Sequence, residues 1–143
     1  MVTIEFSCGD VKLSETTPLD FGTVQAGTAS AIKKITVKNV GNSDAQQCTI
    51  EAVEASVANG FTSISQKGTA DETYNAQKFG NDETTDSWYD YAVLGVGKDY
   101  KTKTGGTIGN TNGSDSFATK WLPPSNGSSG QKVWGNVFSC VYI

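Results

Sequence analysis

Short hydrophobic runs along the chain alternate with clusters of Gly, Asn, Asp, Ser and Thr, and no long helical periodicity is present. Val2, Ile4 and Phe6 alternate with polar residues, which predicts a first strand with one buried face. The same alternation predicts a strand, turn, strand unit at 32–54 and further strands at 88–96, 116–121 and 132–143. Many short strands separated by turn signals predict a single all-β domain over residues 1–143, built as an antiparallel β-sandwich.

The last predicted strand is hydrophobic on both faces. One face carries Trp134, Phe138, Cys140 and Tyr142, and the other carries Val133, Val137, Val141 and Ile143. A strand with two apolar faces either lies in the centre of its sheet or has its second face covered by a partner chain. Both interpretations stay open from the pattern alone.

Two polar segments interrupt the strands, at about 66–87 and 97–114, and we interpret them as long loop insertions. The first is predicted to form a long loop or a single helical turn. In the second, Gly105-Gly106 and Asn112-Gly113 are predicted hairpin tips, because these residues tolerate the backbone conformations of tight turns.

Composition narrows the chemistry, since the chain contains no His and no Arg. The common histidine-dependent nucleophiles and zinc sites are therefore excluded, and we expect neither catalysis nor a cofactor. A net charge of −4 without clustered cations argues against nucleic acid as a partner. No basic and apolar signal segment and no run of about 20 apolar residues is visible, so we expect synthesis in a cytoplasm and no membrane anchor.

Three cysteines, Cys8, Cys48 and Cys140, lie far apart in the sequence and form no CxxC pair. They are predicted to be either buried free thiols or one disulfide with a remaining thiol.

Two further groups of residues have candidate chemistry. Asp82, Glu83 and Asp86 offer oxygen ligands for a cation but lack the spacing of a calcium loop, so a solvated loop is the simpler interpretation. Asp82 and Glu83 could also form the carboxylate pair of a glycosidase. Next to them, Trp88, Tyr89 and Tyr91 either pack in the core or form an aromatic platform for a glycan.

Residues 19–27, with the sequence LDFGTVQAG, and residues 35–41, ITVKNVG, resemble immunoglobulin-like modules of the ASH and major-sperm-protein type. The resemblance implies that Phe21 and Val24 fill one end of an immunoglobulin-like sandwich, that Gly22 and Gly27 allow bends, and that Asn39 caps a turn. Modules of this type bind or assemble and are seldom catalytic, which implies an interaction role.

The short, acidic, turn-rich chain is also similar in style to small tailed-phage virion proteins, such as capsid decoration, head-fibre and tail proteins. This similarity implies a non-enzymatic structural protein of a bacteriophage virion, made in the host cytoplasm, whose partners are other virion proteins or copies of itself. The alternative is a module that binds glycans or a host surface. Interface anchors are predicted at the first and last strands, because large apolar groups dominate such contacts. They are Phe6, Trp134, Phe138, Tyr142 and Ile143.

Overall fold

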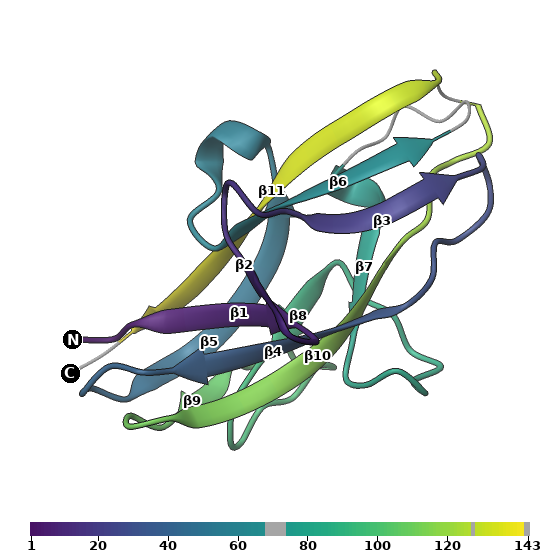
Figure 1. The fold of residues 1–143 in the computed structure, drawn as a ribbon. Coiled ribbons are helices and arrows are strands. Elements are labelled where there is room, and N and C mark those ends of the chain that lie inside the picture. The colour runs from purple at the N-terminus through teal and green to yellow at the C-terminus, as the bar shows by residue number, and fades with distance from the viewer. Residues whose placement is uncertain (68–73, 127, 142–143) are drawn as a thin grey trace.

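The computed structural model describes residues 1–67, 74–126 and 128–141 and consists of two β-sheets that pack face to face (Figure 1). The predicted all-β sandwich is confirmed. In the described residues, helix is limited to two short 3₁₀ turns, η1 (Ala55–Val57) and η2 (Tyr74–Ala76).

The first sheet has only antiparallel neighbours. Its strands, in spatial order, are β2 (Val11–Leu13), β1 (Ile4–Cys8), β4 (Lys33–Asn39), β10 (Gly113–Trp121) and β7 (Gln77–Gly80).

The second sheet is mostly antiparallel, with one parallel pair between β3 and β6. Its strands, in spatial order, are β3 (Leu19–Val24), β6 (Phe61–Lys67), β11 (Gly130–Val141), β5 (Ala45–Val53) and β8 (Tyr91–Val93). A short strand, β9 (Gly106–Ile108), also pairs with β5. Of the two interpretations of the last strand, the structure shows the central position, because β11 lies between β6 and β5.

The predicted strand, turn, strand unit at 32–54 is present, and its two strands belong to different sheets. Asn39 ends β4 and fixes the turn through its side chain. Its Oδ1 accepts a hydrogen bond from the Gly41 amide at 3.0 Å, and its Nδ2 donates to the Ser43 carbonyl at 2.8 Å. The implied role of Asn39 as a turn cap is therefore correct, and the turn carries the chain from one sheet to the other.

The two sheets are joined by an aromatic stack in the core. The Trp134 ring lies between Phe21, at 5.8 Å and nearly parallel, and Trp121, at 5.1 Å. The indole Nε1 of Trp134 donates to Gln77 Oε1 at 2.6 Å, and Gln77 Nε2 donates to Thr119 Oγ1 at 3.0 Å. Because the Trp134 ring comes from one sheet and Gln77 from the other, this buried network fixes how the sheets face each other.

Phe21 and Val24 are both buried, as the family resemblance implied. Gly22 and Gly27 have φ values of +77° and +78°, a region that side chains with a Cβ rarely adopt. The bends expected at these two glycines are therefore present.

The prediction of one continuous strand over 88–96 is wrong at both ends, because β8 covers only Tyr91–Val93. Tyr89 exchanges two backbone hydrogen bonds of 2.8 Å with Phe79 of the first sheet, whereas Tyr91–Val93 pairs with β5 of the second. The chain crosses between the sheets at Asp90, and a single strand cannot belong to both.

The two predicted loop insertions contain strands that the pattern did not reveal. β7 lies within 66–87 and forms an edge of the first sheet, after the short helical turn η2. Within 97–114, β9 pairs with β5, and the hairpin tip lies at 100–103, between the bridged residues Asp99 and Thr104, instead of at Gly105-Gly106. Gly105 and Gly106 are required for a different reason, since a Cβ at either would come within about 2.5 Å of neighbouring backbone.

We expect Trp134→Ala to lower the free energy of unfolding by about 3–5 kcal/mol, because it removes the centre of the stack. Trp134→Phe keeps an aromatic ring but leaves the buried Gln77 oxygen without its donor, and should cost about 1–3 kcal/mol. Urea denaturation measures both. Val133→Ala, at a half-exposed neighbour, is the control with an expected change below about 0.5 kcal/mol. Equal losses for Trp134→Ala and Val133→Ala would contradict the proposed role of the stack.

Candidate functional site

The central strand β11 has different neighbours along its two halves. β6 pairs with Gly130–Asn136, and β5 pairs with the stretch from Gly135 to Val141 on the opposite side. Beyond Asn136, therefore, no strand within the described part of the chain lies on the β6 side of β11. The second half of β11 is an open edge in the middle of the sheet.

A side chain takes the place of a neighbouring strand at one residue of this edge. Asn59 Oδ1 accepts the Phe138 amide at 2.7 Å, and Asn59 Nδ2 donates to the Phe138 carbonyl at 3.0 Å. The pairing of β11 with β5 shifts register between Ser139 and Val141, where β5 advances three residues and β11 only two, so the extra residue lies on β5. β11 therefore keeps its alternation, and the amide and carbonyl of Cys140 face the same way as those of Phe138. Among the described residues, no strand pairs with Cys140 on that side.

β1 has a matching open edge in the other sheet. The Thr3 carbonyl accepts a hydrogen bond from the Val40 amide at 2.8 Å, so the backbone amide and carbonyl of Thr3 point toward the β4 side. Those of the next residue, Ile4, point to the opposite side, away from β4. β2 would be the neighbour on that side, but its pairing ends with Leu13 opposite Phe6. Ile4 thus lies two residues before Phe6, beyond the part of β1 that β2 covers.

The two open edges meet at one end of the sandwich, where the first strand begins and the last strand ends (Figure 1). The Phe6 ring connects them, at 5.2 Å from Phe61 and 5.9 Å from Phe138. Four side chains from the start of the chain and the second half of β11 pack against the core without being fully buried: Val2, Ile4, Phe138 and Cys140. We call these four residues and their strand edges the open corner. Partial burial raises the pKa of the Cys140 thiol, which keeps it protonated near neutral pH.

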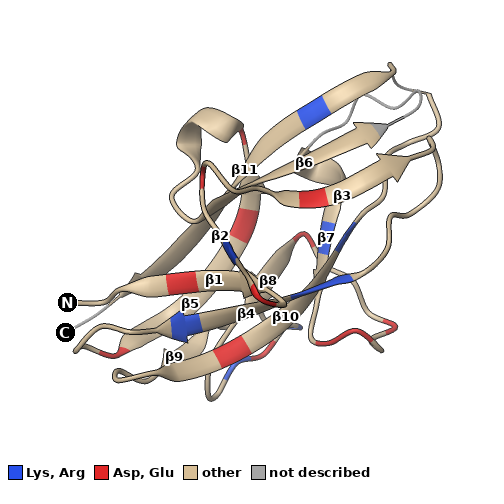
Figure 2. Ribbon diagram, in the orientation of Figure 1, with Lys and Arg blue, Asp and Glu red and all other residues tan. Residues whose placement is uncertain are grey.

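The β11 edge of the open corner lacks the charges that usually protect a strand edge. The chain has no charged residue from Val133 to its last residue, and Figure 2 shows that β11 carries no charge beyond Lys132. Soluble proteins normally place lysine, proline or an inward-pointing charge on an exposed edge to prevent pairing with another chain. This edge instead has the composition of a strand that is covered.

The five predicted interface residues lie in different places: two in the core, one in the open corner and two outside the described residues. Phe6 and Trp134 are buried inside the sandwich, with exposed fractions of 4% and 0%, so in the single chain they serve the core. Phe138 lies in the open corner. Tyr142 and Ile143 lie outside the described residues. The sequence interpretation missed Ile4 and Cys140, which the uncharged run at the end of the chain could have indicated.

A second surface gathers aromatic rings on the β8 side of the sandwich. The Tyr89 ring lies 5.4 Å from Tyr91 and 5.2 Å from Tyr100, and we call these three residues the tyrosine cluster. All three are half-buried. Trp88 is also half-buried, but its ring contacts Lys120, whose Nζ lies 4.3 Å from the ring centre. The structure thus keeps Tyr89 and Tyr91 together, adds Tyr100, and gives Trp88 a different neighbour.

The hydroxyl groups of two of these tyrosines hold the cluster in place. Tyr91 donates to the Tyr100 carbonyl, and Tyr100 donates to the Gly80 carbonyl at 3.0 Å. Burial raises the pKa of Tyr100, so its hydroxyl stays a donor. Sequence reasoning missed Tyr100 because the turn-rich segment around it shows no strand pattern.

The hairpin that carries Tyr100 is attached to the first sheet by Asp115. One carboxylate oxygen accepts the Gly95 amide at 2.7 Å and Lys98 Nζ at 2.8 Å, and the other accepts the Ser116 amide at 2.8 Å. Burial alone would raise the pKa of Asp115, but these hydrogen bonds and the Lys98 charge outweigh it and hold the pKa below its ordinary value.

The acidic loop has a local structural role. Asp82 Oδ1 accepts hydrogen bonds from the Thr84 hydroxyl and amide, which lower the Asp82 pKa and form a turn. Glu83 and Asp86 are exposed. Over the part of the chain that the structure describes, no three His, Cys, Asp or Glu side chains gather as a metal site would require.

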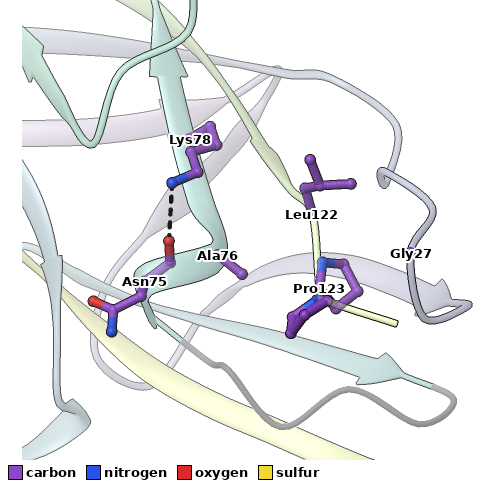
Figure 3. A pocket seen from close by; sticks show the side chains of 7 residues that line it. Gly27, Asn75, Ala76, Lys78, Leu122 and Pro123 are labelled. Carbon is purple, nitrogen blue, oxygen red and sulfur yellow. Dashed lines mark hydrogen bonds between the residues drawn. The ribbon is translucent and has the colours of Figure 1, made fainter. Parts of the chain in front are cut away.

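A cavity of about 390 Å³ lies beside η2, with apolar walls from Ala76, Leu122 and Pro123 (Figure 3). At its rim, Lys78 Nζ donates to the Asn75 carbonyl at 3.1 Å and forms an ion pair with Asp90 at 2.5 Å. The cavity therefore presents hydrophobic surface and an ammonium group that is already paired.

The cysteines are free thiols in the structure, and burial raises the pKa of Cys48 to about 12. None of the helical segments described here has the length and hydrophobicity that crossing a bilayer demands. Comparison of the sequence with models of known protein families and with curated proteins finds no match.

We expect Asp115→Asn to flatten the dependence of stability on acidic pH. The pKa of Asp115 is lower in the folded chain than its ordinary value of 3.8, so its ionised form stabilises the fold above about pH 4. This stabilisation is lost as the pH falls through the folded pKa. Urea unfolding at about pH 7 and about pH 3 should show a larger loss for the native chain than for the variant. Parallel pH profiles would contradict this role of Asp115.

Proposed function

We propose that the protein is a non-enzymatic assembly module that docks to another protein chain by accepting a β-strand at the open corner. We place it in a bacteriophage virion, as its composition suggests, with virion proteins or further copies as partners. The immunoglobulin-like type of sandwich is part of this proposal and is supported by the buried Phe21 and Val24 and by the Asn39 turn.

The observation that carries the proposal is the half-length pairing of β11. The pairing of β11 with β6 ends at Asn136, where Phe61 begins β6. β11 continues to Val141 without a described neighbouring strand on that side and without a protecting charge. An added strand would pair with the backbone of Cys140 and place alternate side chains over Ile4 and Phe138. Each hydrogen bond formed would contribute about 0.5–1.5 kcal/mol, and the apolar surface buried about 25 cal/mol per Å².

The non-enzymatic part of the proposal rests on the residues that are present. The sequence has no histidine, and the carboxylate of Asp82 is engaged in its own turn. A hydrolytic pair would need one carboxyl with a raised pKa beside an ionised one, whereas the pKa of Asp82 is lowered.

A photo-crosslinking residue at position 141 tests the docking site in cells that make the protein naturally. Val141 and Val133 are matched, because both lie on β11 with exposed fractions of 46% and 49%, and only Val133 lies in the half paired with β6. We expect position 141 to crosslink to one protein, identified by mass spectrometry, and position 133 to give no such product.

A crosslink to a different virion protein or to a second copy would both support docking at this edge. Equal products from positions 141 and 133, or no product from 141, would overturn it. The virion setting has a separate test, because a gene beside those for capsid or tail proteins supports it and a neighbourhood without virion genes contradicts it.

A glycan-binding module is the second candidate, favoured by the tyrosine cluster. Three half-buried rings within 6.3 Å of each other, tilted by 20–42° relative to one another, offer the apolar ring surface on which sugars stack. Two of the hydroxyl groups are occupied by hydrogen bonds within the chain, so recognition would depend on ring faces and on neighbouring charged groups such as Glu51 and Lys103.

For this candidate we expect binding on a glycan array that Tyr89→Ala abolishes and Trp88→Ala weakens less, because Trp88 contacts Lys120 and stands outside the cluster. Val11→Ala, on a half-exposed residue of β2, is the control and should bind as the native chain does. Absence of binding by the native chain would eliminate the glycan candidate.

A further inference from the structure

We infer that the strand added at the open corner is β11 of a second copy of this chain, paired antiparallel across a two-fold axis near Cys140. This inference rests on the proposed docking function and names its partner. It follows from the backbone geometry of β11, from its charge and from the place where β6 ends.

The backbone geometry is self-complementary. Cys140 presents its amide and its carbonyl to the open side, and an antiparallel pair of such residues exchanges two hydrogen bonds. When the two-fold axis passes beside Cys140, the residue faces its own copy, so the amide of each chain donates to the carbonyl of the other. One surface then serves both partners.

The ends of the neighbouring strands leave room for this arrangement. With the axis at Cys140, Val141 of one copy lies opposite Ser139 of the other, and the described end of the second β11 stays clear of β6, which stops at Asn136. β5 is on the far side of each β11, so the pairing joins two copies of the second sheet into one continuous sheet.

Charge favours self-pairing at this edge over self-pairing elsewhere. The chain has a net charge of −4, so two copies repel each other in general. The stretch from Val133 to Val141 has no charge, and an antiparallel pair of these segments brings no like charges together. The half-exposed Val141 and the half-buried Phe138 and Cys140 would each lose contact with water at this interface.

Light scattering during size-exclusion chromatography, over a series of concentrations, tests the inference with Val141→Lys and Val133→Lys. Across the two-fold axis the residues at position 141 are diagonal neighbours, about 7–8 Å apart on the same face of the sheet, so two lysines there repel each other. We expect the native chain and Val133→Lys to approach twice the chain mass of 15.1 kDa. Val141→Lys should dissociate at about tenfold higher concentration, equivalent to about 1.4 kcal/mol.

Thermal unfolding of dilute samples is the control that checks whether both lysine variants are folded. A native chain that remains at 15.1 kDa up to millimolar concentration, a mass of three or more chains, or equal dissociation of the two variants would overturn the two-fold pairing. If the native chain is monomeric, the two-fold pairing is wrong, and the crosslinking experiment still tests strand docking. That experiment would then identify a different protein as the partner.

Labelling with a thiol reagent gives an independent readout at the interface. Cys140 lies in the open corner, whereas Cys8, also half-buried, lies opposite Val11 at the other end of β1. We expect Cys140 to become protected as the native chain is concentrated, and Cys8 to react at the same rate throughout. Equal rates for Cys140 at low and high concentration in the native chain would contradict the inference.

Discussion

The fold depends on the contact that Trp134 makes between two sheets. Its ring is stacked between Phe21 of its own sheet and Trp121 of the other, and its only polar atom donates to the buried Gln77. Stacking gives a large apolar contact but allows sliding, whereas a hydrogen bond in a water-free interior allows one position. The combination sets the relative placement of the sheets, and with it the places where strand edges meet.

The same strand that supplies this core residue also supplies the open edge. The first half of β11 is paired with β6 and packed around Trp134, and its second half extends beyond β6 toward the end of the sandwich. A strand fixed so firmly at one end holds its other end in a defined direction. An added strand would therefore meet an edge that is already extended, so little conformational entropy would be lost on the side of this chain.

The tyrosine cluster is built on a different principle. Tyr100 belongs to a hairpin that has little core of its own, and Asp115 secures this hairpin through Lys98 and the Gly95 amide. The open corner presents backbone groups and apolar side chains, whereas the cluster presents ring faces beside charges. The partners proposed for the two surfaces differ accordingly, a β-strand at one and a glycan at the other.

The sequence by itself determined the all-β class and the position of β1, β4, β5, β10 and β11, because alternation of apolar and polar residues follows directly from a pleated strand with a buried face. For β11 it left two interpretations, of which the structure shows the central one. It also indicated the Asn39 turn, whose hydrogen bonds are local. It did not reveal β7 or β9, which are short edge pairings inside polar segments, or the break at Asp90. Only the tertiary structure decided that Trp134 is enclosed and that Cys140 and Ile4 share an open corner, since both depend on where neighbouring strands end. Strand ends are set by long-range pairing, and no local pattern in the sequence records them.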